Sequence, residues 1–123
     1  MKYPFSKYIL LAAIAAFVFG CESKNEEELF ENEECDTLNV TYNGNIEIIL
    51  RNNCYECHAK AVATAGVILE GYDNLILRVE SGRFRGAVNH LEGYIPMPKD
   101  RGFLPECDLA KINIWLDNGA PNN

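Results

Sequence analysis

Apolar residues recur at helical spacing in three stretches of this chain, whereas strict alternation of apolar and polar residues is almost absent. Residues at positions i, i+3 and i+4 share one face of an α-helix, so each stretch predicts a helix with one buried face. A further short helix is expected over 83–90, and we predict an all-α domain of three to four short helices. The three periodic stretches are 44–53, with Ile46, Ile49 and Leu50; 73–80, with Leu75, Ile76 and Val79; and 105–118, with Leu109, Ile112, Trp115 and Leu116.

Turn-forming and capping residues set the predicted ends of these helices. Asp73 is expected to cap the second helix, and the pair Ser81 and Gly82 to stop it. Pro105 suits the first position of the last helix, and Gly119 suits its end. The capping and turn residues therefore agree with the helix bounds that the spacing of apolar residues predicts.

Two long loops, 59–69 and 91–104, connect the predicted helices and are rich in small residues, glycine or proline. A domain of about ninety residues with so few helices has a thin core of its own. We therefore expect a large apolar group to complete the core, with the loops wrapped around it.

The first twenty residues have the pattern of an export signal. Two lysines precede the apolar run 9–19, which is shorter than an ordinary membrane span. Residues 18–21 resemble the lipobox of bacterial lipoproteins, in which the chain is cut before a cysteine that then receives lipid. We predict a lipoprotein signal peptide over 1–20 and lipidation of Cys21. An uncleaved membrane anchor is the alternative, and either one exports the domain.

The net charge of −7 is unevenly distributed. Residues 21–35 hold seven acidic residues and one lysine, whereas residues 36–123 hold eleven acidic residues against eight Lys and Arg. We expect residues 21–34 to be a disordered acidic tether between the lipid and a domain at 35–123. The lipid would hold the domain at the periplasmic face of a membrane or at the cell surface. No basic patch in the sequence suggests nucleic-acid binding.

Residues 54–58 have the sequence Cys-Tyr-Glu-Cys-His, the pattern of an attachment site for c-type haem. Two thiols three positions apart can form thioethers to the two haem vinyl groups. On a helical turn Cys54, Cys57 and His58 share one face, so the imidazole lies beside the anchored ring as an iron ligand. The sequence therefore predicts one covalent haem c, with its iron, held by these three residues.

Met97 is the best candidate for the axial ligand opposite His58. It stands between two prolines, which restrict the backbone and make the segment stiff and extended. The alternative of a methionine that only fills the core is less suited to a position between prolines. His90 is the rival ligand, and bis-histidine ligation would lower the reduction potential. His90 could instead contact a haem propionate or lie on the surface.

The five cysteines divide by chemistry. Lipid and haem use three of them, which leaves Cys35 and Cys107 in a compartment where disulfides persist. We predict a Cys35–Cys107 disulfide, with two separate buried thiols as the alternative.

With these residues in place, residues 36–123 resemble the small monohaem cytochromes c of class I, of the kind found as small bacterial haem-domain lipoproteins. The resemblance rests on Cys54, Cys57 and His58, on Met97 between prolines, and on a last helix that carries Trp115. It implies a helical cytochrome c-like fold around covalent haem, His/Met ligation and one-electron transfer. With both axial positions filled and a domain of mild charge, we expect an electron carrier rather than an enzyme, monomeric, with transient redox partner proteins.

Several supporting roles and alternative functions stay open at this point. Arg83 and Arg85 are candidates for pairing with haem propionates, and equally for an exposed basic face. Aromatic residues that could line the ring are Tyr72, Phe84, Tyr94 and Trp115.

The main alternative function is binding or sensing of a gas or peroxide at a labile sixth position. A dithiol redox pair at Cys54 and Cys57 would require a neighbouring strand pattern that the sequence lacks. A zinc site is less favoured, because only one Cys-x-x-Cys pair is present.

Overall fold

The computed structural model describes residues 35–123, which form one compact unit. The predicted signal peptide (1–20), the lipidation site Cys21 and the predicted tether (21–34) lie outside the described residues. Within the described part of the chain, no helix has both the length and the apolar character needed to cross a membrane.

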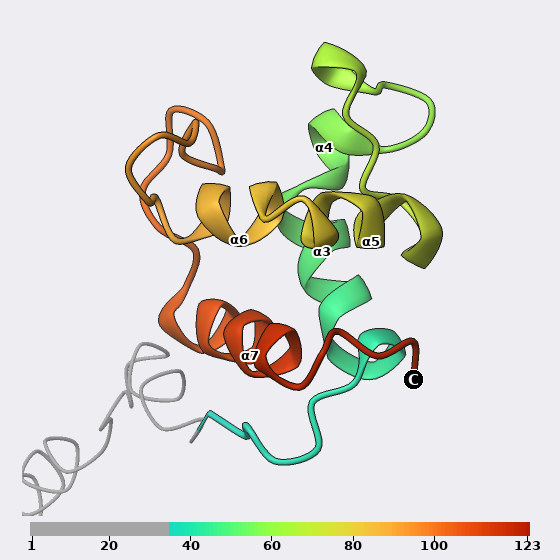
Figure 1. Ribbon diagram of the computed structural model, residues 1–123, viewed down its shortest axis with the longest axis vertical. Coiled ribbons are helices and arrows are strands. Elements are labelled where there is room, and N and C mark those ends of the chain that lie inside the picture. The colour runs from blue at the N-terminus through green and yellow to red at the C-terminus, as the bar shows by residue number, and fades with distance from the viewer. Residues whose placement is uncertain (1–34) are drawn as a thin grey trace, which may run out of the picture. The chain divides into compact units, whose positions relative to one another are not determined.

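The described residues are helical and contain no β-strand, which confirms the all-α class (Figure 1). Five α-helical segments are present between residues 35 and 123, rather than three or four, because the segment that carries the haem motif forms a turn of its own. The elements in order are η1 (Tyr42–Ile46), α3 (Glu47–Asn53), α4 (Tyr55–His58), η2 (Thr64–Gly66), α5 (Tyr72–Glu80), α6 (Arg83–Val88) and α7 (Glu106–Asp117).

The first predicted helix begins earlier than expected and breaks at the haem motif. Its opening turn, η1, is wide, and the Thr41 hydroxyl accepts a hydrogen bond from the Gly44 amide at 3.1 Å. At Cys54 the backbone leaves helical geometry (φ −124°, ψ −35°), although its amide still bonds to the Leu50 carbonyl at 2.8 Å. The break gives α4 a direction of its own, so the motif is not a simple extension of α3.

Helix α5 ends at the residues that the sequence predicted, but it does not start as predicted. Gly71, with φ +88°, precedes α5 as its cap, so the prediction that Asp73 caps this helix was wrong. The carboxylate of Asp73 lies instead in the first turn, where negative charge suits the helix dipole. Ser81 ends α5, and Gly82 takes the left-handed conformation (φ +72°) that starts α6 almost at once.

The last helix, α7, begins one residue later than predicted, because Pro105 is extended and caps it rather than opening it. Cys107 in its first turn forms a disulfide with Cys35, with Cα atoms 5.5 Å apart. This is the pair that the cysteine count selected, and it fastens the start of the compact unit to α7. Gly119 (φ +86°) follows the helix, as expected for a helix end.

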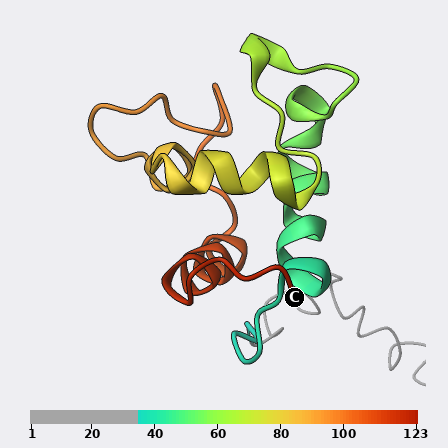
Figure 2. The ribbon, with the colours of Figure 1, turned by 45° about the vertical axis from the view of Figure 1, so that its right-hand side comes forward.

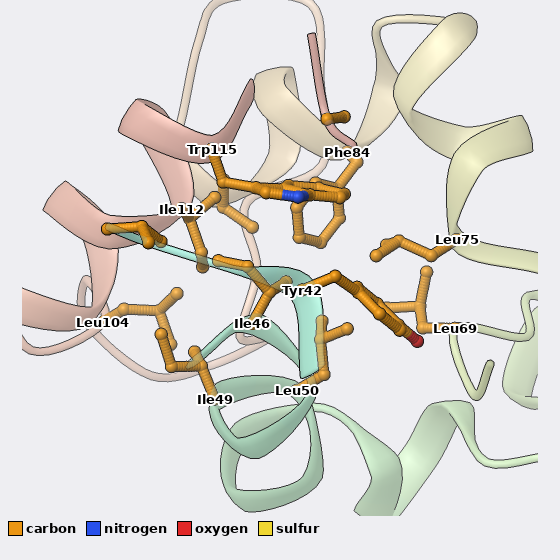
Figure 3. Packing of buried hydrophobic residues seen from close by; sticks show 13 residues of the cluster. Tyr42, Ile46, Ile49, Leu50, Leu69, Leu75, Phe84, Leu104, Ile112 and Trp115 are labelled. Atoms are coloured by element: carbon orange, nitrogen blue, oxygen red, sulfur yellow. The ribbon is translucent and has the colours of Figure 1, made fainter. Parts of the chain in front are cut away.

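The hydrophobic core lies among η1, α3, α5, α6 and α7 (Figure 3). Trp115 is fully buried, and its indole N–H donates to the Pro121 carbonyl at 2.9 Å. The ring of Tyr42 meets that of Tyr72 edge to face at 5.2 Å. In α7 only Ile112 and Trp115 are fully buried, so the apolar stripe is narrower than the periodicity predicted.

Candidate functional site

A cavity of about 640 Å³ lies beside the core, within the size range of small-molecule and cofactor sites. Its walls come from α4, the loop 59–70, the helices α5 and α6, and the loop 89–105. In Figures 1 and 2, α4 and the loop after α6 both rise above the row formed by α5 and α6, α4 on the right and the loop on the left. Three core residues, Leu69, Phe84 and Val88, also face the cavity, so one of its walls is the core itself.

All four predicted haem-site residues line this one cavity. Cys54, Cys57 and His58 come from α4 and the break before it, and Met97 comes from the loop after α6. About forty residues of chain separate the motif from Met97. The fold therefore brings together the residues that the motif chemistry grouped.

The two thiols of the motif are free and differ in environment. Cys54 is half-buried and Cys57 is exposed. Burial raises the pKa of the Cys54 thiol to about 11. In reactive dithiol pairs the pKa of the attacking thiol is lowered, because the thiolate is the nucleophile. The surroundings of Cys54 therefore suit an uncharged sulfur, such as a thioether, better than a dithiol redox pair.

The imidazole of His58 is oriented by the loop that follows α4. Its Nδ1–H donates to the Val67 carbonyl at 3.1 Å, since a carbonyl can only accept. The neutral ring then carries its lone pair on Nε2, the atom that is free to bind a metal. A second bond, from the Leu69 amide to the His58 carbonyl at 2.9 Å, holds the same loop to α4. Sequence analysis missed this arrangement, because the acceptor at Val67 is a backbone group that any residue supplies.

Met97 is held through its backbone by the end of α6. Its amide donates to the Ala87 carbonyl at 3.0 Å, and its carbonyl accepts from His90 Nε2 at 3.1 Å. The His90 ring stacks on Phe103, with centroids 4.0 Å apart and planes inclined by 20°. His90 does not line the cavity, and its Nε2 is occupied by Met97. This geometry disfavours His90 as the rival axial ligand.

Positive charge gathers around the cavity, which the sequence did not reveal. Arg78, Arg83, Lys99 and Arg101 line it, together with one acidic residue, Glu56. These four are half of the Lys and Arg residues in 36–123. They come from α5, α6 and the following loop, so no run of basic residues marks them. We call these four basic residues the basic rim.

The members of the basic rim differ in their partners. Arg101 pairs with Glu56 at 2.9 Å, which connects the loop 89–105, here called the Met97 loop, to α4. Arg83 makes no ion pair with any residue in 35–123. Arg85 pairs with Asp117 of α7 at 2.6 Å and does not line the cavity. Of the two arginines considered for propionate binding, only Arg83 is therefore placed for it.

The candidate aromatic residues divide in the same way. Phe84 and Tyr94 line the cavity, whereas Trp115 lies only in the core and Tyr72 packs against the core. The Tyr72 hydroxyl donates to the Ala120 carbonyl at 2.8 Å, away from the site. The Tyr94 ring packs directly on the backbone of Gly86 in α6.

These residues fit a haem c group in donor chemistry and in surroundings. One wall supplies two thiols and a correctly oriented imidazole, and the loop after α6 supplies a thioether. Apolar side chains line much of the remaining surface, and the basic rim matches the two carboxylates of a haem. Among the described residues, no three His, Cys, Asp or Glu side chains are grouped as a metal-ion site.

Comparisons of this chain with protein-family models, with curated proteins and with solved structures gave no match.

Proposed function

We propose that residues 35–123 form a monohaem c-type cytochrome of the class I kind, which carries single electrons and catalyses no reaction of its own. The observation that supports this most strongly is the convergence of Cys54, Cys57, His58 and Met97 on one cavity. The haem-attachment motif and the proline frame of Met97 led us to expect that these four residues act together, and all four line the same cavity. Haem c, when bound, supplies one iron that takes up and releases a single electron.

The residues of the chain bind and orient this group. Cys54 and Cys57 would anchor it through thioethers. The bond from His58 Nδ1 to Val67 O leaves Nε2 as the nitrogen that would bind the iron. Met97 would complete the axial pair. With His58 and Met97 both holding it, the group would offer no open position to a substrate, which favours electron transfer over catalysis.

Burial and charge tune the site further. Leu69, Phe84 and Val88 exclude water from one side, and a low dielectric disfavours the more highly charged oxidised state. A thioether axial ligand raises the potential in the same direction. Arg83 would neutralise a propionate at the cavity wall, because a guanidinium binds a carboxylate in a bidentate manner.

The proposal also covers the location of the domain and its partners, which the N-terminal sequence pattern suggests. Lipid at Cys21 and the acidic tether 21–34 would hold the domain at the periplasmic face of a membrane or at the cell surface. Its partners would be redox proteins that bind transiently to the monomer near the cavity mouth. Export would also place residues 54–58 in the compartment where c-type haem is attached.

The deciding experiment is expression of the full chain in a host that matures c-type cytochromes, followed by a visible spectrum and a mass measurement under denaturing conditions. We expect a red protein with covalently bound haem, and a far-red charge-transfer band of thioether–iron ligation in the oxidised state. The band should disappear in Met97→Ala, and covalent attachment should be lost in Cys54→Ser with Cys57→Ser. A colourless wild-type protein would contradict the proposal and revive the dithiol alternative.

Carbon monoxide separates the proposal from gas binding or sensing at a labile sixth position. We expect the reduced wild type to bind it slowly and weakly at neutral pH, and Met97→Ala to bind it rapidly. Rapid stoichiometric binding to the wild type would favour the alternative function.

A further inference from the structure

The structure fixes the residue at position 97 through both polar groups of its backbone. The amide of Met97 donates to the carbonyl of Ala87, and its carbonyl accepts from the ring of His90. Both partners belong to the C-terminal end of α6 and the turn after it. The methionine is therefore attached to the helix that forms one wall of the cavity, not only constrained by its neighbouring prolines.

The ring of His90 is itself held in place. The His90 amide donates to the same Ala87 carbonyl at 3.3 Å, and the residue takes a left-handed conformation with φ +51°. This conformation is uncommon for a residue other than glycine and persists where surrounding contacts determine it. Phe103, from the far end of the same loop, covers the ring at 4.0 Å. His90 therefore connects the two ends of the loop to its middle, where Met97 lies.

We propose that His90 is a positioning residue that holds Met97 toward the cavity, and that the hydrogen bond from Nε2–H to the Met97 carbonyl is the contact responsible. The inference rests on the proposed function, since it concerns how the proposed axial ligand Met97 is held in place. Without the bond, the part-buried Met97 carbonyl loses its His90 partner, and the loop gains conformations in which the sulfur points elsewhere. An added ligand then competes more easily for the iron.

A matched pair of variants isolates this hydrogen bond. His90→Leu removes the donor, whereas His90→Gln keeps an amide N–H at about the reach of Nε2. Both side chains are unbranched at Cβ, so both carry a similar backbone strain at φ +51°, and both lose the stacking on Phe103. A difference between them therefore reports on the hydrogen bond and not on the strain or the ring.

The measurement is imidazole binding to the oxidised, haem-loaded full chain, with the far-red band recorded in each titration. One neutral hydrogen bond corresponds to about a fivefold change in an equilibrium constant. We expect His90→Leu to bind imidazole about fivefold more tightly than the wild type and to have a weakened band. His90→Gln should stay within twofold of the wild type. Phe103→Leu, which leaves the bond in place, should also resemble the wild type.

The outcomes separate the two proposals. If the wild type has the band but His90→Leu binds imidazole like the wild type, the positioning role is overturned and the proposed function stands. If His90→Gln behaves like His90→Leu, the hydrogen bond is not responsible, and the inference is equally overturned. If the wild type lacks covalent haem or the band, both proposals fail together. Should His90→Leu not fold, His90→Asn replaces it, since asparagine tolerates positive φ and is too short to reach Met97 O.

Discussion

Replacing Gly86 by alanine tests how closely the Met97 loop packs on α6. Gly86 is buried in the helix, and a Cβ added there would lie 2.4 Å from Cγ of Tyr94 and 2.5 and 2.6 Å from its two Cδ atoms. Carbon atoms in contact are about 3.5–4.0 Å apart, so the ring has to move by roughly 1 Å. The nearest clashing atom, Cγ of Tyr94, lies on the axis of the Cβ–Cγ bond, so a turn of the ring about that bond does not relieve the overlap.

Two effects of opposite sign decide the result. Alanine stabilises a helix interior by about 1 kcal/mol relative to glycine. Insertion of a methyl group into a packed contact costs about 1–3 kcal/mol. We expect steric overlap to dominate, because the Tyr94 amide is tied to the Leu91 carbonyl at 3.2 Å and limits the ring's displacement. The net change should be a loss of about 1 kcal/mol in the free energy of unfolding.

Urea denaturation of the holoprotein, followed by circular dichroism, measures this change. Gly102→Ala is the control, since nothing lies within 4 Å of an added Cβ at that position. In a Tyr94→Ala background the clash is absent, so Gly86→Ala should stabilise the protein by about 1 kcal/mol through helix propensity alone. Stabilisation by Gly86→Ala in the wild-type background, or equal effects in both backgrounds, would refute the packing argument.

Three further predictions concern the rest of the domain. The disulfide spans 72 residues, so Cys35→Ser with Cys107→Ser should lower the free energy of unfolding by about 4 kcal/mol; a loss below about 1 kcal/mol in urea would contradict the loop-entropy account. Burial raises the pKa of Tyr42 to about 12, so the contribution of this group to the free energy of unfolding should be lost as the pH rises from 10 to 12. Tyr42→Phe removes a buried hydroxyl that has no hydrogen-bond partner among the described residues, so it should reduce that loss, and an unchanged pH profile would argue against this account. The side chains of Arg101 and Glu56 are 61% and 72% exposed, so Arg101→Gln should change the unfolding free energy by less than about 1 kcal/mol, and a larger change in thermal unfolding would show that the pair braces the loop.

Local sequence signals were sufficient for most of the helices. The spacing of Leu75, Ile76 and Val79, followed by Ser81 and Gly82, predicted α5 and its end, because periodicity and turn chemistry act over a few residues. The start of α5 was less predictable. A capping role for Asp73 was plausible by residue type, but the cap lies two residues earlier at Gly71, whose φ of +88° with ψ of 144° falls in a region that is essentially restricted to glycine.

In the candidate site, the reactive side chains were predictable from the sequence, but the backbone groups that hold them were not. Sequence reasoning could single out Cys54, Cys57, His58 and Met97 because their own side chains have the chemistry to bind haem. Their supports at Val67 and Ala87 are backbone carbonyls, which carry no signature in the sequence and come together only through the fold. His90 was noticed as a histidine, but its part depends on the position of Met97 O, which is a property of the folded loop.

The distribution of charge changes the meaning of the domain's mild acidity. Four cations and Glu56 give the cavity lining a formal charge of +3, while the remainder of residues 36–123 holds four cations against ten acidic residues. A haem brings two carboxylates, which would offset most of the positive charge at the rim. On the proposed function, the basic rim therefore matches the cofactor rather than a partner protein. The exposed surface around the filled cavity would then be close to neutral at its mouth, which agrees with short-lived encounters that are weakly steered by charge.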